Sequence, residues 1–286
     1  MASTTTGPGT LYLCATPIGN LEDITLRVLR VLQEVHLIAA EDTRRTKKLL
    51  NHYNITTPLV SYHEHNRKSR GEELIRRLRG GEDIALVSDA GMPGIADPGT
   101  ELVQDAVACG IPLVALPGPT ALITALVVSG LPTDSFVFAG FPPRKGRERA
   151  AFFNTLAAEG RTAVLYEAPH RLLETLADLE KAAGDRWLVV ARELTKQYEE
   201  IRRGPISQHL EHFRKHTPRG EFCLVLAGAP AGEEGNLTPG RLEEGVELVQ
   251  ELVALGVAKK EAIRIAARER DLSKNALYAA LLDRKE

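Results

Sequence analysis

Short apolar runs alternate with amphipathic stretches along the chain from about residue 11 to residue 228. Short, mostly apolar runs predict buried strands, and apolar positions that recur every three or four residues predict helices packed on them. The expected strands are 11–16, 35–40, 57–62, 83–88, 111–118, 135–141, 162–167, 187–193 and 222–228. The expected helices are 24–34, 43–53, 71–79, 100–108, 121–129, 148–158 and 170–183. This alternation predicts an α/β protein.

The expected elements form two series that are separated by a turn at Leu116–Ala121. Because each series is long enough to build its own sheet, we expect an N-terminal α/β domain at 11–118 and a C-terminal α/β domain at 119–230. Residues 1–10 are expected to be a disordered N-terminus. Residues 231–286 begin as a polar, Gly-rich linker and continue as a helical tail.

The tail has a sequence pattern of its own. Two short helices that meet at Asp271–Ser273, with Ser273 as the N-cap of the second, resemble a helix-turn-helix. Residues 256–286 carry eight Lys or Arg against five Asp or Glu, which is a net charge of +3. An RNA-binding tail and an appendage that only packs or dimerises both remain open.

Composition narrows the class of protein. The 286 residues are 43% hydrophobic and carry a formal net charge of -2, so the chain can bury a large core and has no overall positive field to attract nucleic acid. Cys14, Cys109 and Cys223 lie far apart in apolar runs, which argues against a zinc site or a disulfide framework. No signal-peptide pattern and no apolar segment of about 20 residues is present. We therefore expect a soluble, cytoplasmic protein without a metal.

The segment VSDAGMPGIADPG, Val87–Gly99, follows an expected strand, at the edge where ligands bind in open α/β sheets. Its spacing matches neither phosphate-binding glycine motif, and Asp89 and Asp97 would repel phosphates. Similar Gly/Pro-rich turns follow two other strands, at Thr16–Thr25 and Leu116–Ala121. Three such turns predict one cleft for a neutral or cationic ligand, whereas a well-capped turn without function is the alternative for each.

Several polar residues also follow strands. Glu41 and Asp42 precede a helix that begins with Arg44 and Arg45, for which a solvated charged face is the alternative. Glu167 ends another strand, where buried ion pairing is the alternative.

Histidines occur in two groups. His63 and His65 are two residues apart, but a metal site needs a third ligand that the sequence does not offer. His209, His212 and His216 share a helix face and lack the HExxH arrangement, so we expect them to contact solvent.

A basic loop stands out in a chain whose overall charge is close to neutral. The segment FPPRKGRER, Phe141–Arg149, contains four cations and one acid, a net charge of +3, after a pair of prolines. Such a loop suits contacts with phosphodiesters.

Eight motifs, taken in order, resemble the tetrapyrrole-methylase superfamily, and within it the bacterial 16S rRNA cytidine 2'-O-methyltransferases. The motifs are TPIGNLEDIT, AAEDTRRTKKLL, SYHEHN, VSDAGMPGIADPG, LPGPTA, GFPPRKGRER, YEAPHRL and ARELTK. The resemblance runs from about Leu11 to Gly228. It implies two α/β domains of tetrapyrrole-methylase type with S-adenosylmethionine (SAM) in the cleft between them, in a homodimer.

The resemblance also implies which residues contact the cofactor. They are Ile18, Gly91, Met92, Pro93, Ile95, Thr120, Ala121, Tyr166, Leu194 and Ala227. Where the tetrapyrrole enzymes often have Gly-Asp-Pro, this chain has Gly91-Met92-Pro93, so a contact from that aspartate is lost here.

The implied reaction is methylation of a ribose 2'-hydroxyl in 16S rRNA, as naked RNA or in the small ribosomal subunit. A carboxylate or histidine would assist loss of the hydroxyl proton, and the candidates are Glu41, Asp42, His63, Asp89 and Glu167. The expected contacts with the RNA backbone are Arg44, Arg45, Arg144, Lys145 and Arg147. Methylation of a tetrapyrrole carbon, and a nucleic-acid-binding regulator that senses a small ligand, are the alternative functions.

Overall fold

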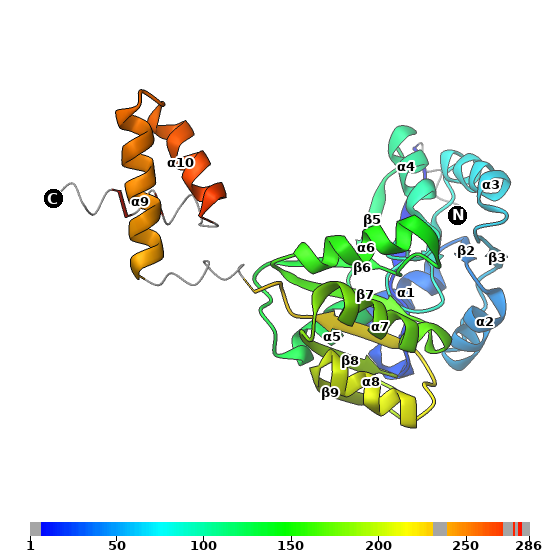
Figure 1. Cartoon of the computed structure of the whole chain (residues 1–286). Helices are drawn as coiled ribbons and strands as arrows, with labels where there is room; N and C mark the ends of the chain where they lie inside the picture. Colours follow the sequence, from blue (N-terminus) through cyan, green and yellow to red (C-terminus); the bar gives the residue numbers. More distant parts are fainter. Residues whose placement is uncertain (1–6, 231–238, 271–276, 278–279, 282–286) are drawn as a thin grey trace. The chain divides into compact units, whose positions relative to one another are not determined.

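The computed structural model describes residues 7–230, 239–270, 277 and 280–281. The chain divides into two compact units, Met1–Ala227 and Gly228–Glu286. The first contains two five-stranded sheets and the second a helical pair (Figure 1). The expected division of the first unit into two domains near residue 118 stays a prediction.

Each strand and helix expected from the apolar pattern is present, with ends that differ by a few residues. The strands are β1 Leu11–Cys14, β2 Leu37–Ala40, β3 Leu59–Ser61, β4 Ile84–Val87, β5 Leu113–Leu116, β6 Phe136–Gly140, β7 Thr162–Glu167, β8 Trp187–Arg192, β9 Glu200–Pro205 and β10 Phe222–Leu226. The helices are η1 Leu21–Asp23, α1 Leu26–Glu34, α2 Thr43–His52, α3 Arg67–Arg79, α4 Thr100–Ala108, α5 Ala121–Ser129, α6 Gly146–Ala158, η2 Pro169–Arg171, α7 Leu172–Ala183, α8 Ile206–Lys215, α9 Pro239–Ala254 and α10 Lys259–Glu269. The strand missing from the expectation is β9, a charged edge strand without an apolar run.

The first sheet is parallel throughout, in the order β3-β2-β4-β1-β5. Its central strands β2 and β4 are buried along their whole length, as expected for a sheet covered on both faces. Helices α1 and α2 contribute to the hydrophobic cluster on one face, and α3 and α4 to the cluster on the other. Because the strands are parallel, the segments after β1, β2, β4 and β5 emerge at one edge.

The second sheet is mixed, in the order β6-β7-β10-β8-β9. Strands β6 and β7 are parallel, whereas β10 runs antiparallel to both of its neighbours, β7 and β8. Helices α6, α7 and α8 cover one face, and α5 packs on the other with Ile18 from the first turn. The edge at which β7 and β8 end is therefore the edge at which β10 begins.

In the second unit, α9 and α10 bury a small apolar cluster that includes Val246, Val249 and Ala266. The expected helix junction at Asp271–Ser273 lies outside the described residues. None of the helices in the described part of the chain has the length and the apolar run needed to cross a bilayer.

Candidate functional site

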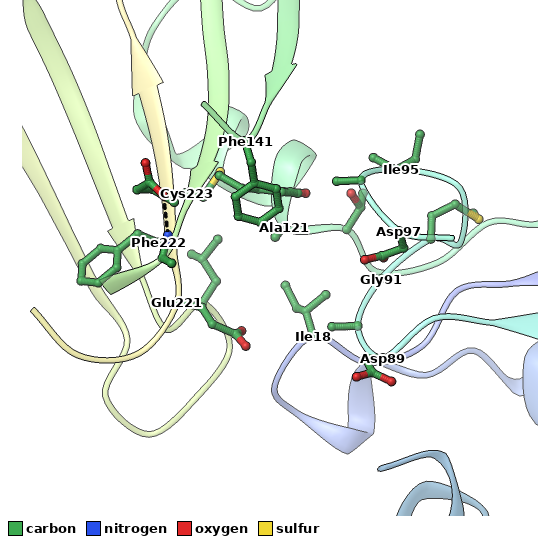
Figure 2. Close-up of a pocket in the computed structure, with 18 of the residues that line it drawn as sticks. Ile18, Asp89, Gly91, Ile95, Asp97, Ala121, Phe141, Glu221, Phe222 and Cys223 are labelled. Carbon is green, nitrogen blue, oxygen red and sulfur yellow. Dashed lines mark hydrogen bonds between the residues drawn. The ribbon is translucent and has the colours of Figure 1, made fainter. Parts of the chain in front are cut away.

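A cavity of about 380 Å³ lies within the first unit, lined by strand residues of the second sheet and by segments that follow strands of both sheets (Figure 2). Its lining residues are Ile18, Glu41, Arg45, Asp89, Ala90, Gly91, Met92, Ile95, Ala96, Asp97, Thr120, Ala121, Phe141, Tyr166, Glu167, Ala168, Pro169, Ala191, Leu194, Glu221, Phe222 and Cys223. The volume falls within the range of small-molecule sites, about 300–1,000 Å³. The three Gly/Pro-rich turns expected to share one cleft do meet here.

Hydrogen bonds join the loop Val87–Gly99 to the first turn. The amides of Thr16 and Gly91 each donate to the carbonyl of the other, both at 2.9 Å. The Thr16 hydroxyl donates to the Ser88 carbonyl at 3.0 Å, and the Ser88 hydroxyl to the Gly91 carbonyl at 3.1 Å. Gly91 has φ of 83°, in the left-handed region that favours glycine. The loop thus presents its backbone at a fixed place in the wall.

Aromatic side chains form the wall on the side of the second sheet. The Tyr166 ring makes edge contacts with Phe138 at 5.0 Å and Phe141 at 5.6 Å between ring centroids. Its hydroxyl oxygen accepts a hydrogen bond of 3.0 Å from the Leu122 amide in the first turn of α5. Burial raises the pKa of Tyr166 to about 12, so this phenol stays neutral at physiological pH.

Carboxylates gather at the side of the first sheet. Burial, and next the charge of Asp89, raise the pKa of Glu41, whose Oε2 is buried without a hydrogen-bond partner in the structure. Burial, and next the charge of Glu41, raise the pKa of Asp97 to about 7. The one arginine in the lining is Arg45, with a guanidinium nitrogen 3.5 Å from Asp89 Oδ2. The cavity is therefore apolar and acidic.

Two other candidate carboxylates already have partners. Asp42 caps α2 by accepting from the Arg44 amide at 2.8 Å, and its carboxylate pairs with the Arg44 side chain. The hydrogen bonds from Arg44 hold the pKa of Asp42 well below its usual range. Asp89 accepts from the Asp42 amide at 3.0 Å, which joins the ends of β2 and β4. Asp42 is outside the cavity lining, and Asp89 is within it.

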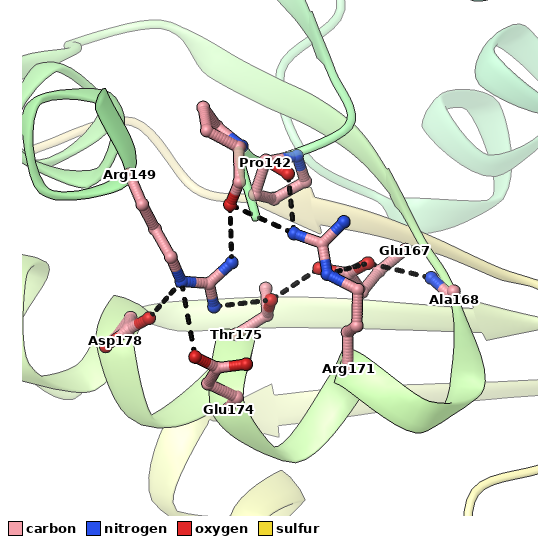
Figure 3. A network of polar contacts seen from close by, with 9 residues as sticks. Pro142, Arg149, Glu167, Ala168, Arg171, Glu174, Thr175 and Asp178 are labelled. Carbon is pink, nitrogen blue, oxygen red and sulfur yellow. Dashed lines mark hydrogen bonds and ion pairs between the residues drawn. The ribbon is translucent and has the colours of Figure 1, made fainter. Parts of the chain in front are cut away.

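Glu167 takes part in an internal network (Figure 3). Its side chain has no exposed surface, and it accepts hydrogen bonds from the Ala168 amide at 2.8 Å and from the Thr175 hydroxyl. The Arg171 guanidinium lies 3.6 Å from its Oε1. Buried ion pairing, the alternative for this residue, is what the structure shows.

Most of the expected cofactor positions lie together. The lining includes Ile18, Gly91, Met92, Ile95, Thr120, Ala121, Tyr166 and Leu194. Pro93, in the same loop, is buried and is not part of the lining. Ala227 follows the end of β10, away from the cavity, where the Arg186 guanidinium donates to its carbonyl at 3.1 Å. It lies there because β10 is antiparallel, so its first residues, Phe222 and Cys223, reach the cavity instead.

The expected RNA contacts lie at different places. Arg45 reaches the cavity lining, and the Arg44 side chain is exposed beside Asp42. Arg144, Lys145 and Arg147 are exposed in the basic loop and at the start of α6, outside the lining.

The histidines do not build a metal site. His63 is outside the cavity lining, and the described residues contain no group of three or more His, Cys, Asp or Glu side chains placed to hold a metal ion. The expectation that His209 contacts solvent is wrong. It is buried against β8, with Nε2 2.9 Å from the Leu188 carbonyl, since the apolar face of α8 must cover the sheet.

The residues that the sequence analysis did not select include Asp97, Phe141, Phe222 and Cys223. The sequence did point toward Asp97, since it is the second aspartate of the loop Val87–Gly99, which was predicted to line the cleft. Phe141 precedes the prolines of the basic loop, a position that marks a turn but no ligand. Phe222 and Cys223 could be predicted as lining residues only from the direction of β10, which no local sequence pattern provides.

Comparison with known proteins places the chain in a family. The sequence model described as Tetrapyrrole (Corrin/Porphyrin) Methylases matches residues 10–209. A protein of Synechocystis sp. named Ribosomal RNA small subunit methyltransferase I is 50% identical over 276 residues, 96% of this chain and 98% of that protein. The protein of the same name from Bacillus subtilis is 47% identical, over 95% of this chain and 94% of its own.

Solved structures resemble the first unit in fold. A diphthine synthase matches with a TM-score of 0.62 at 13% identity, over 77% of this chain and 90% of its own. A uroporphyrin-III-C-methyltransferase from Thermus thermophilus matches with a TM-score of 0.56 at 23% identity, over 77% and 94%. At these identities the likeness concerns the fold alone. From the family match and the relatives together, the chain belongs to the tetrapyrrole (corrin/porphyrin) methylase family, with the relatives named Ribosomal RNA small subunit methyltransferase I.

Proposed function

We propose that the protein transfers a methyl group from SAM to the ribose 2'-hydroxyl of a cytidine in small-subunit 16S rRNA. The observation that carries this proposal is the 50% identity, over 96% of the chain, to a protein named Ribosomal RNA small subunit methyltransferase I. The substrate in that name belongs to the relative, and we extend it to this chain because the match covers both proteins almost completely.

The chemistry of the cavity supports SAM as the methyl donor. SAM carries a sulfonium and an ammonium group and no phosphate, which suits a lining with several carboxylates and one arginine. Tyr166 and Ile95 would offer apolar surface to the cofactor, and Gly91 would let the backbone approach it closely. The residues that would hold the cofactor are Ile18, Gly91, Met92, Ile95, Thr120, Ala121, Tyr166 and Leu194. When bound, SAM supplies an electrophilic methyl group.

The task of the protein is to orient a 2'-hydroxyl and accept its proton. We propose Glu41 Oε2 as the proton acceptor, because this oxygen is buried without a hydrogen-bond partner in the structure and burial raises the pKa of Glu41. Asp42 and Glu167 already accept hydrogen bonds from other residues, and Asp89 accepts one from the Asp42 amide. The neighbouring charge of Asp89 raises the pKa of Glu41 further and so makes it a better base.

A small groove next to the cavity supports an RNA substrate. It has a volume of about 170 Å³ and is lined in part by Arg45 and Lys48 of α2. Arg45 and Asp89 line both the groove and the cavity. A phosphate held by these cations would lie near the carboxylates, with Arg44, Arg144, Lys145 and Arg147 as further backbone contacts.

We also propose that the protein acts as a homodimer. Helix α5 is apolar around its circumference, although a surface helix normally has a polar face. Ile123 and Val127, four residues apart on one side, are 42% and 67% exposed. A second copy of the chain would bury this side.

The test is incubation with methyl-labelled SAM and, separately, small-subunit RNA, assembled small subunits and a uroporphyrinogen. We expect label on RNA or subunits, at a cytidine whose 3' phosphodiester linkage resists alkali. Methylation of a base, label on the tetrapyrrole, or transfer to none of the substrates would each contradict the proposal. In the same assay, Glu41→Gln should lower kcat about 10²-fold or more with SAM affinity nearly unchanged, whereas Asp42→Asn, the control, should retain most of kcat.

A further inference from the structure

The prolines of the basic loop that follows β6 accept hydrogen bonds from two arginines, one in α6 and one in η2 (Figure 3). The loop includes Pro142 and Pro143, which have no amide proton, so their carbonyls are their only backbone groups for hydrogen bonds. Arg171 in η2 donates to the Pro142 carbonyl at 2.5 Å and to the Pro143 carbonyl at 3.1 Å. Arg149 in α6 donates to the Pro143 carbonyl at 3.0 Å. Both carbonyls therefore have charged donors.

The two arginines are themselves fixed. Arg149 is buried, with Nε 2.7 Å from Asp178 Oδ2, Nη2 donating to the Thr175 hydroxyl at 3.1 Å, and its guanidinium over the Phe153 ring. The Thr175 hydroxyl in turn donates to Glu167. The Glu167 carboxylate faces the Arg171 guanidinium at 3.6 Å. One continuous network thus runs from Arg149 through Thr175 and Glu167 to Arg171.

The loop joins two different surfaces. At its first residue, Phe141 lines the cavity and contacts the Tyr166 ring. Directly after the prolines, Arg144 and Lys145 are exposed to solvent. The network also ends at the cavity, because Glu167 and Ala168 belong to its lining. A change in how the prolines are held would therefore move the cations relative to the cavity wall.

We propose that Arg149 and Arg171 are positioning residues that hold the loop so that Arg144 and Lys145 meet the RNA backbone in register with the cavity. This inference rests on the proposed function. Neither arginine is proposed to touch RNA or cofactor; each acts through the proline carbonyls. A lysine at position 171 would keep the charge but lose the planar fork that reaches two carbonyls and Glu167 together.

The first measurement does not depend on activity. Trypsin cuts after lysine and arginine, and a loop that is firmly held is cut slowly. We expect the cut after Arg144 or Lys145, identified by mass spectrometry, to be at least fivefold faster in Arg171→Lys than in the native chain. Arg161→Lys, at an exposed arginine paired with Glu159, is the matched control and should leave the rate unchanged. Equal rates in the native chain and Arg171→Lys would overturn the inference.

The second measurement is a double-mutant cycle on RNA affinity. We expect Arg171→Lys to weaken RNA binding five- to tenfold and to reduce the slope of log K against log salt, although no charge is removed. In a chain that already carries Arg144→Ala and Lys145→Ala, the same change should cost almost nothing more. The inference would be overturned if the losses of RNA affinity were additive, or if Arg171→Lys had the same salt dependence as the native chain. Either result would mean that the network serves stability alone. SAM affinity should stay within twofold throughout.

Thermal denaturation of each variant shows whether the fold is retained. If the arginine variants do not fold, Pro143→Gly frees the loop without leaving a buried charge, and the same rate increase and the same non-additivity are expected. Failure of the proposed function has a different signature, because the native chain would then methylate no RNA. The trypsin comparison tests whether Arg171 holds the loop in either case.

Discussion

Glu41 and Asp42 are adjacent in the chain, yet their carboxylates have opposite surroundings. Burial raises the pKa of Glu41, whereas hydrogen bonds from Arg44 lower the pKa of Asp42. Asp97, 55 positions beyond Asp42, shares the buried environment of Glu41 and titrates near neutral pH. At the scale of the residue, chemistry at this site is therefore determined by partners and burial, and residue type alone does not distinguish the candidates.

The raised pKa of Asp97 leads us to expect that the stability of the protein depends on pH. Its pKa is about 7 in the folded chain against an ordinary value of 3.8, so between these values the folded chain binds more protons than the unfolded chain. The free energy of unfolding contributed by this group consequently falls as pH rises from about 4 to 7. We expect Asp97→Asn to be more stable than the native chain at pH 8, with a difference that shrinks toward pH 4, measured by urea denaturation.

The control for this prediction is Asp185→Asn. Hydrogen bonds from Ser207 lower the pKa of Asp185, so its contribution to stability is present above about pH 4 and is lost in more acidic solution. This variant should be less stable than the native chain by an amount that is constant between pH 5 and 8. A constant difference for Asp97→Asn over the same range would contradict the raised pKa.

At the scale of the element, the cavity is made by turns more than by helices or strands. The turn after β1 packs closely on the segment after β8, and Ile18 and Leu194 line the cavity from these two segments. A Cβ at Gly19 would lie 2.9 Å from the Leu194 carbonyl oxygen and 2.4 Å from Lys196 Cγ. The Lys196 side chain can move, but the carbonyl oxygen belongs to the backbone. Only glycine permits this approach without displacing one segment.

Gly19→Ala should therefore widen the cavity at this contact. We expect SAM affinity, measured by calorimetry, to fall about tenfold. The effect on thermal stability should be smaller, because Gly19 is exposed. Gly160→Ala is the control, because a Cβ there meets nothing within 4 Å. Unchanged SAM affinity in Gly19→Ala would show that the two segments adjust freely and do not define the site.

At the scale of the whole molecule, two differently built sheets contribute to one cavity. The parallel sheet supplies the acidic side and the backbone of the glycine loop, and the mixed sheet supplies most of the aromatic side. Helix α5 follows the first sheet in the chain and packs against the second, in the cluster that includes Val164 and Val225. Its other side exposes Ile123 and Val127, which is the surface proposed for the homodimer.

The homodimer can be tested on that helix. Val127→Asp places a charge on the exposed apolar side of α5, and we expect it to shift the native dimer toward monomer in analytical ultracentrifugation at equal concentration. Val107→Asp is the control, because Val107 is similarly exposed, at 62%, on α4. A monomeric native chain, or equal dissociation in both variants, would contradict the proposed surface.

Local pattern was sufficient for much of this protein. The periodicity of apolar residues predicted the positions of the strands and helices, because that periodicity reflects which side of each element is buried. The glycines and prolines predicted the turns that meet at the cavity, and eight ordered motifs were sufficient for the family.

What only the tertiary structure decided depends on pairs of residues far apart in the chain. The direction of β10 follows from its pairing with β7 and β8, and it places Cys223, not Ala227, at the cavity. The different surroundings of Glu41 and Glu167 also depend on residues distant in the chain. Glu167 faces the Arg171 guanidinium and accepts a hydrogen bond from Thr175, while Glu41 Oε2 has no hydrogen-bond partner in the structure. Strand direction and burial are properties of the packed chain, so no local segment contains them.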